Sequence, residues 1–273
     1  MSINRDTLEN EMKYTTLLVE KEAGIGTITF NRPDKLNSLT HQGFDEFIQA
    51  LLEMDADSEV RVVIITGAGR AFSAGLDIDE ASKGPREFDL QAVPLQGTLA
   101  WTAHIMRNLK KPIIAAINGS AVGAGFSIAL ASDIRIASEK AKLGASFLRV
   151  GLVPEIGSTY NLPRLTGIAK ACELVFTGRI IDAQEAKEIG LVNEVVSENE
   201  LRDATFKMAT QIAEVAPIPL QLARKALYQG LDCDLPTQIQ LEQLSQSTCF
   251  KSEDYKEGMK AFLEKRSPVF KGK

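Results

Sequence analysis

Residues 110–133, KKPIIAAINGSAVGAGFSIALASD, are the stretch that decides the fold class of this chain. An apolar run leads through glycines into a segment with helical spacing that starts near Gly125. Residues 60–69, VRVVIITGAG, follow the same plan earlier in the sequence, with a β-branched run that ends in glycines. A strand, a glycine-rich turn and a helix, met twice, predict an α/β chain with buried strands.

The flanking segments extend this α/β pattern in both directions. Upstream, residues 14–30 alternate around a glycine-containing turn, as the two strands of a hairpin would. Residues 41–55 carry apolar side chains three and four apart, which predicts an amphipathic helix capped by Thr40. Downstream, residues 133–138 and 140–146 have the composition of two more short strands.

Helical patterns dominate the last part of the chain. They begin after Pro154, are interrupted by a strand-like segment at 191–197, and are continuous from about Leu201. Apolar stripes on the C-terminal helices are typical of packing or subunit contacts. The predicted organisation is a flexible N-terminal extension at 1–13, an α/β core at 14–205 and a C-terminal helical region at 206–273.

The composition excludes several classes of protein. The 273 residues are 44% hydrophobic, which is enough for a large core. The net charge of −5 argues against attraction to nucleic acid or to anionic membranes. The three cysteines are widely spaced and the two histidines lack a metal-ligand motif, so we expect neither disulfides nor a metal. We expect a cytoplasmic protein, because no segment has the pattern of a signal peptide or a membrane span.

The glycine-rich segments predict an anion pocket. A strand that ends in glycines and leads into a helix presents free N–H groups beside the positive end of the helix dipole. Ile128 and Phe72 stand where a dinucleotide-binding turn would need a third small residue, and neither segment has the Gly-Lys-Ser/Thr ending of a P-loop. The pattern therefore favours a single oxyanion over a pyrophosphate.

A second interpretation starts from residues 71–75, AFSAG, which differ by one residue from a nucleophile elbow. A serine hydrolase would need a histidine base, and both His41 and His104 lie on predicted helices with no supporting motif. We favour a turn-stabilising role for the hydroxyl of Ser73.

Six spaced segments resemble the crotonase superfamily, the enoyl-CoA hydratase/isomerase family. The resemblance covers about residues 14–271. In chain order the segments are NRPDKLNSL, TGAGRAFSAGLDIDE, KKPIIAAINGSAVGAGFSIALASDIRIAS, GLVPEIGSTYNLPRLTG, GLVNEVV and EGMKAFLEKRSPVF.

The resemblance implies a crotonase-like spiral of ββα units, an acyl-CoA thioester as substrate, and a helical C-terminal trimerisation region. It implies a homotrimer or a dimer of trimers, with no cofactor apart from the coenzyme A of the substrate. Carried onto this chain, the two oxyanion-hole N–H groups belong to Leu76 and Ala124. The positions that the resemblance assigns to coenzyme A are Lys35, Ala74, Leu76, Ile78, Gly123, Phe262 and Lys265. Lys35 and Lys265, taken alone, are also typical of solvated surface charges.

The acid/base residues of this chain depart from the family pattern. Hydratases of the family use two glutamates, and here Ser127 and Phe147 stand at those places. Glu155, in LVPEIGS, matches a lone carboxylate found in the Δ3,Δ2-enoyl-CoA isomerases and the PaaG-like isomerases. A single base suffices for a 1,3 shift of a double bond, because it can remove a proton from C2 and return it at C4. A carboxylate that only stabilises a helix start, or acid/base chemistry by Asp77, remain the alternatives.

Three other functions stay open or are excluded by the residues. An enoyl-CoA hydratase with unusual acid/base residues and a catalytically silent acyl-CoA-binding protein are the alternatives to the isomerase. RNA binding would need a lysine-rich helix, and the basic stretch at 107–111 is too short in an acidic chain. The acyl pocket is expected to be shaped by the loop-like segment 82–98.

Overall fold

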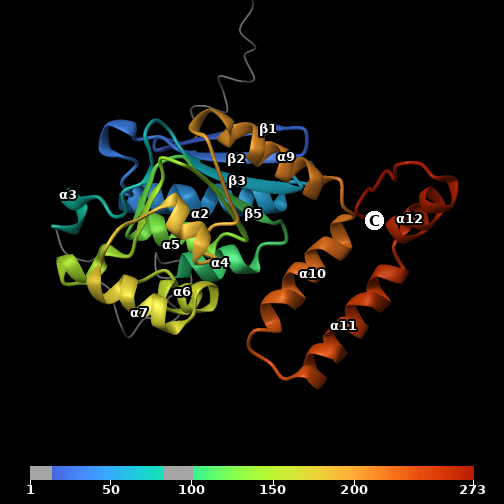
Figure 1. The fold of residues 1–273 in the computed structure, drawn as a ribbon. Coiled ribbons are helices and arrows are strands. Elements are labelled where there is room, and N and C mark those ends of the chain that lie inside the picture. The colour runs from blue at the N-terminus through green and yellow to red at the C-terminus, as the bar shows by residue number, and fades with distance from the viewer. Residues whose placement is uncertain (1–13, 83–100) are drawn as a thin grey trace, which may run out of the picture.

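The computed structural model describes residues 14–82 and 101–273. The extension predicted at 1–13, and nearly all of the segment expected to shape the acyl pocket, lie outside the described residues. Two sheets form the centre of the molecule, and helices surround them (Figure 1).

The larger sheet has six strands in the order β1-β2-β3-β5-β7-β10. All neighbours are parallel except β1 and β2, which form an antiparallel hairpin. The hairpin turn is Ala23–Gly24, where both residues have positive φ, the backbone that a two-residue hairpin turn with the right twist requires. The strands are β1 (Leu17–Glu22), β2 (Ile25–Phe30), β3 (Val62–Gly67), β5 (Ile113–Ile117), β7 (Ile134–Ser138) and β10 (Glu194–Val196).

The smaller sheet explains the repeated sequence pattern. Its order is β4-β6-β8-β9, and each of β4, β6 and β8 follows a strand of the larger sheet. The glycine-rich turns predicted from sequence therefore each contain a short strand, so that the chain passes repeatedly from one sheet to the other. This is the ββα spiral that the resemblance implied. The strands are β4 (Ala71–Ser73), β6 (Ser120–Val122), β8 (Lys142–Gly144) and β9 (Ile181–Asp182).

Alternate residues of the large sheet face two separate helical layers. Val63 and Ile65 belong to the main core with α2 (His41–Ala56), whereas Val62 and Ile64 pack with α9 (Leu201–Ala213). The side-chain period of two in a strand causes this division. Helix α2 begins as predicted, with the Thr40 hydroxyl accepting a hydrogen bond from the N–H of Gly43.

The remaining helices lie beside the small sheet or beyond the core. Helix α5 passes through the interior with all eight of its residues buried. The helices are α3 (Ile78–Ala81), α4 (Thr102–Asn108), α5 (Ala124–Ala131), α6 (Ser158–Thr166), α7 (Ile168–Thr177), α8 (Ala183–Glu188), α10 (Pro217–Gln229), α11 (Leu235–Phe250) and α12 (Glu253–Glu264).

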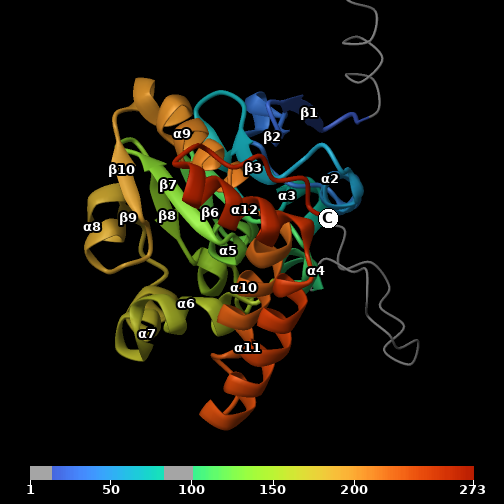
Figure 2. The ribbon, with the colours of Figure 1, turned by 90° about the vertical axis from the view of Figure 1, so that its right-hand side faces the viewer.

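The C-terminal helices project from the core, as α11 and α12 show in Figure 1, and α11 also extends below the core in Figure 2. The predicted boundary near residue 205 falls inside α9, whose packing against β3, β5 and β7 makes it part of the core. The chain leaves the core between Ala213 and Pro217 instead. Among the described residues, no helix combines the length and the apolarity that crossing a membrane requires.

Candidate active site

The first candidate oxyanion donor, the N–H of Leu76, is left free by a parallel bridge. Leu39 donates its N–H to the carbonyl of Gly75 (2.8 Å) and accepts from the N–H of Asp77 (2.9 Å). In a parallel pairing the residue between those two partners directs its own N–H away from the bridge. Within the described part of the chain, the N–H of Leu76 has no acceptor.

The turn around Leu76 is held by a buried polar network. The Asn37 side-chain amide donates to the carbonyls of Ala68 and Ala71 at 2.9 and 2.7 Å. The carboxylate of Asp77 accepts from the Arg32 guanidinium at 2.9 Å and from the Ser38 hydroxyl at 3.0 Å. Burial acts to raise the pKa of Asp77, but the hydrogen bonds from Arg32 and Ser38 outweigh it and lower that pKa. Asp77 is thus engaged in the turn.

The second candidate donor is the N–H of Ala124, which is the first residue of α5. Its position in the first turn leaves this N–H without an intrahelical acceptor, at the positive end of the helix dipole. Gly123 precedes it with φ 56°, in the region that favours glycine, and donates its own N–H to the carbonyl of Gly144. The complete burial of α5 fixes the direction of the free N–H.

Gly75 brings the two donors together. Its φ is 93°, and a Cβ at this position would lie 3.2 Å from the nitrogen of Ala124 and 2.8 Å from the carbonyl oxygen of Val122. The backbone that leads into Leu76 therefore passes directly against the start of α5, and a side chain would force them apart. Two free N–H groups on adjoining backbone segments are the arrangement that an oxyanion hole needs.

Glu155 is a half-buried carboxylate. It lies just before α6, and among the described residues its side chain makes no hydrogen bond or ion pair. Burial raises the pKa of Glu155 above the usual value of 4.5. A raised pKa brings a carboxylate closer to the range in which it can both take and give a proton near neutral pH.

A hydroxyl pair links Glu155 to the start of α5. The buried hydroxyls of Ser127 and Ser158 lie 2.6 Å apart, and the Ser158 hydroxyl donates to the carbonyl oxygen of Glu155. Ser127 also lies 3.2 Å from the carbonyl oxygen of Gly123. Ser127 therefore ties the loop of Glu155 to the helix whose first N–H is a candidate donor.

Phe147 is buried in the short 3-10 turn Ser146–Val150, where it has no proton to exchange. The sequence interpretation missed Ser158 and Arg32. Ser158 carried a signal, because it follows Glu155 by three residues, the range of a local turn bond. Arg32 carried none, because its partner Asp77 lies 45 residues away.

The hydrolase interpretation fails on the environment of Ser73. The hydroxyl is fully buried, donates to the carbonyl of Asn37 at 2.8 Å, and accepts from the N–H of Gly75 at 3.2 Å. Its role is the turn stabilisation predicted from sequence. Neither His41, which lies near Glu80, nor His104, which contacts Asn108, is bonded to it.

The positions assigned to coenzyme A divide into two groups. Ala74 donates its N–H to the carbonyl of Leu36, which brings the turn of Lys35 beside the first glycine-rich motif. Lys35 lies 3.8 Å from Asp79 at the surface, and Ile78 is 82% exposed. These residues, with Leu76, Gly123 and Ala124, gather on one side of the molecule.

Phe262 and Lys265 do not join that group within one chain. Both are exposed at the end of α12, and α12 lies on the opposite side of the molecule from α3 in Figure 1. Among residues 14–82 and 101–273, no cluster of three His, Cys, Asp or Glu side chains could hold a metal ion.

Comparisons with known proteins agree with this fold. The family model for enoyl-CoA hydratase/isomerase matches residues 20–273. The fold is that of the crotonase class of acyl-CoA enzymes. The chain belongs to the enoyl-CoA hydratase/isomerase family.

Some relatives of the chain are named hydratases and others are named isomerases. A short-chain-enoyl-CoA hydratase of Clostridium acetobutylicum is 39% identical, with 93% of this chain and 97% of the relative covered. A 1,2-epoxyphenylacetyl-CoA isomerase of Escherichia coli is 35% identical, with 94% and 98% covered. The crystal structure of an enoyl-CoA hydratase from Bacillus anthracis superposes with a TM-score of 0.88 at 38% identity, over 95% of this chain and all of that one.

Proposed function

We propose that the chain shifts the double bond of a 3-enoyl-CoA to give the 2-enoyl-CoA. Glu155 removes a proton from C2 of the substrate, and the negative charge moves to the thioester oxygen as a dienolate. That oxygen rests between the N–H groups of Leu76 and Ala124. Glu155 then returns the proton to C4, so that the double bond moves by one position and nothing is gained or lost overall.

The observation that carries the proposal is the state of Glu155. The carboxylate has no partner among the described residues, and burial raises its pKa toward the range where it can both take and give a proton. The two positions of the paired hydratase glutamates hold Ser127 and Phe147, so a second carboxylate does not stand there. The two main-chain donors supply stabilisation that grows as the enolate forms.

The decisive experiment is the turnover of Glu155→Gln on a 3-enoyl-CoA, followed by the gain of the conjugated thioester absorbance. We expect a loss of at least about 10²-fold in kcat, with binding of the CoA ester retained, since general acid/base catalysis typically contributes ~10²- to 10⁴-fold. The exposed Glu139→Gln is the matched control and should be unaffected. Turnover of Glu155→Gln near the wild-type rate would overturn the proposal.

The same assay gives a pH dependence. Because the raised pKa belongs to a base that must be ionised, the acid limb of kcat/KM should lie above the ordinary range of a glutamate near 4.5. A limb at or below that value would contradict the assignment of Glu155.

A second candidate is enoyl-CoA hydration with unusual acid/base residues, favoured by the hydratase names of several relatives. Incubation with crotonyl-CoA, with loss of the conjugated thioester absorbance, separates it from the isomerase. Fast hydration would reverse the order of the two candidates. Tight binding of acyl-CoA without turnover of either substrate would favour the catalytically silent alternative.

We further propose a homotrimer, or a pair of trimers, assembled through the C-terminal helices. The support is a set of exposed apolar side chains on α10, on α11 and in the segment between them, including Leu227, Leu231 and Leu244. Such an assembly gives Phe262 and Lys265 a neighbouring subunit whose coenzyme A they can meet. The proposal includes no cofactor beyond the substrate's coenzyme A, and a cytoplasmic location.

A further inference from the structure

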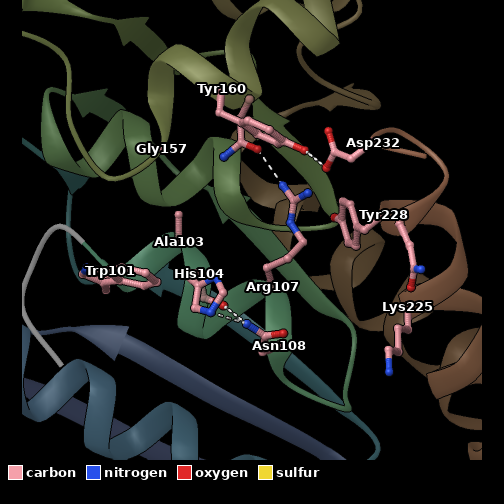
Figure 3. A pocket seen from close by; sticks show the side chains of 12 residues that line it. Trp101, Ala103, His104, Arg107, Asn108, Gly157, Tyr160, Lys225, Tyr228 and Asp232 are labelled. Carbon is pink, nitrogen blue, oxygen red and sulfur yellow. Dashed lines mark hydrogen bonds between the residues drawn. The ribbon is translucent and has the colours of Figure 1, made fainter. Parts of the chain in front are cut away.

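A cavity of about 530 Å³ lies between α4, α6 and α10, outside the oxyanion hole (Figure 3). Its volume is within the range of small-molecule sites. Gly157, two residues after Glu155, lines it, but Glu155, Leu76 and Ala124 do not. Nothing in the proposed chemistry uses this space.

The cavity carries an excess of positive charge. Its lining contains Arg107 and Lys225, and among the described residues neither has a carboxylate within ion-pair distance. The carboxylate that also lines the cavity, Asp232, is already engaged by the Tyr160 hydroxyl and by Arg164 at 3.1 Å. In a chain of net charge −5, two such cations in the lining of one cavity mark a local preference for an anion.

Arg107 is held in place, and among the described residues most of its N–H donors have no acceptor. Its guanidinium lies 3.7 Å from the ring centre of Tyr228 and donates to the side-chain oxygen of Asn161 at 2.6 Å. Figure 3 shows this side chain between α4 and the rings of Tyr160 and Tyr228. A guanidinium has five N–H donors, so the remaining ones can meet both oxygens of a carboxylate.

The frame around Arg107 is rigid. The buried Arg224 of α10 donates to the carbonyls of Met106, Arg107 and Leu109, at the end of α4, and pairs with Asp133 at 2.9 Å. Because both walls are pinned together, the position of the guanidinium is set before any ligand arrives. Pre-organisation of this kind lowers the cost of binding.

The other walls suit the apolar body of an organic ligand. The rings of Trp101, Tyr160 and Tyr228 and the methyl group of Ala103 line the cavity. We propose that the cavity binds an organic carboxylate, with Arg107 as the partner of the carboxylate group and these rings against its carbon skeleton.

Two sources could supply that carboxylate. One is the far end of the acyl group, which rests on the proposed function: a chain that passes Glu155 and Gly157 need run only about one helical turn of α6, about 5.4 Å, to reach the level of Asn161 and Arg107. The substrate would then be a 3-enoyl-CoA that ends in a carboxylate. The other source is a free carboxylic acid.

The experiment compares 3-octenoyl-CoA with 3-octenedioyl-CoA, which differ by the terminal carboxylate, and adds free octanedioate as a separate probe. The proteins are the wild type, Arg107→Met, Arg107→Lys and the control Arg202→Met, which removes an exposed arginine that also stacks on a ring. Isomerisation gives kcat/KM, and calorimetry gives Kd for all three probes, so that binding is measured even if no turnover occurs.

If the substrate supplies the carboxylate, the wild type should prefer the dioyl ester by about tenfold to a hundredfold, the range for charge-assisted hydrogen bonds. Arg107→Met should lose this preference, Arg107→Lys should keep part of it, and Arg202→Met should keep all of it. If a free acid is the ligand, octanedioate should bind with the same dependence on Arg107 while the two esters behave alike.

Equal Kd values for the two esters in every variant, together with no Arg107-dependent binding of octanedioate, would overturn the inference. The failure of the proposed function is a separate result, because it appears as no isomerisation of either ester by the wild type. In that case the calorimetric comparison still decides whether the cavity binds a carboxylate.

Discussion

Helices α5 and α11 use apolar residues in opposite ways. All eight residues of α5 are buried, whereas none of the 16 residues of α11 is. Helix α5 is enclosed by the chain that contains it, so its free N–H at Ala124 has a fixed direction. Helix α11 exposes Leu235 and Leu244 to solvent, at 71% and 69% of their surface.

The difference in burial between α5 and α11 separates the part of the chain that holds the candidate active site from the part that we propose for assembly. The candidate oxyanion hole and Glu155 belong to the part of the chain that completes its own core. The projecting helices offer the surface that a second copy would cover, and α10 joins the two parts through Arg224. Changes at the joint, in the core and on α11 should therefore have different consequences.

The largest effect is expected at the joint. Arg224 is buried and pairs with Asp133, so Arg224→Met removes the charged partner of a carboxylate that keeps the Ile113 N–H and the Tyr228 hydroxyl as donors. The substitution also leaves three carbonyl groups without their Arg224 donor. Removing one member of a buried pair typically costs about 3–5 kcal/mol. Chemical denaturation should show a loss of this size, with the exposed Arg202→Met within about 0.5 kcal/mol of the wild type. An Arg224→Met protein as stable as the wild type would mean that α10 is not fixed by this contact.

The next prediction tests the close contact between Gly75 and the start of α5 in the core. Gly75→Ala places a methyl group 2.8 Å from the carbonyl oxygen of Val122, which must separate Leu76 from the start of α5. Since loss of one oxyanion donor costs about 10²- to 10³-fold in rate, we expect kcat to fall by that factor.

The control for Gly75→Ala is Gly24→Ala in the hairpin turn, which also has positive φ but has room for a methyl group. It should lower stability by about 1–2 kcal/mol without a change in kcat. If both variants kept full activity, the two N–H groups would not form the oxyanion hole.

The sequence predicted the parts of this site that depend on local patterns. The hairpin, the Thr40 cap and the glycine turns of the repeat follow from periodicity and turn chemistry, and the structure confirms them. The short strands β4 and β6 were not predicted, because three residues are too few to show a period.

The missed contacts are those between segments distant in the sequence. The bond of Arg32 to Asp77 and that of Ser127 to Ser158 join residues 45 and 31 positions apart, and neither residue type announces its partner. The cavity around Arg107 is built by three helices from separate parts of the chain. The resemblance supplied Leu76 and Ala124, but only the fold explains why their N–H groups are free.

A smaller effect is expected on α11. Leu244 is 69% exposed in the single chain, so Leu244→Lys should leave the fold of each subunit unchanged. If an assembly buries Leu244, the substitution should weaken each contact by about 1.5–3 kcal/mol, the value of burying such a side chain. Sedimentation at low protein concentration should then show smaller species than the wild type forms. Gln246→Lys, also exposed on α11, is the control for charge. Equal masses for both variants and the wild type would place the interface elsewhere.

The smallest effect concerns the half-buried carboxylate of Glu155. Because the folded state raises the pKa of Glu155, the folded chain binds the proton more tightly than the unfolded chain does. Stability therefore falls as pH rises from the ordinary value near 4.5 through the folded pKa, and the full cost is present above it. Glu155→Gln carries no charge to bury, so it should have a slightly higher Tm than the wild type at pH 8 and the same Tm near pH 4.

Asp77→Asn is the control and should have a lower Tm than the wild type at pH 8, because the pKa of Asp77 is lowered by its partners and its ionised form stabilises the fold. A Glu155→Gln protein less stable than the wild type at pH 8 would show that the carboxylate has a structural partner after all, and would weaken its assignment as the proton carrier.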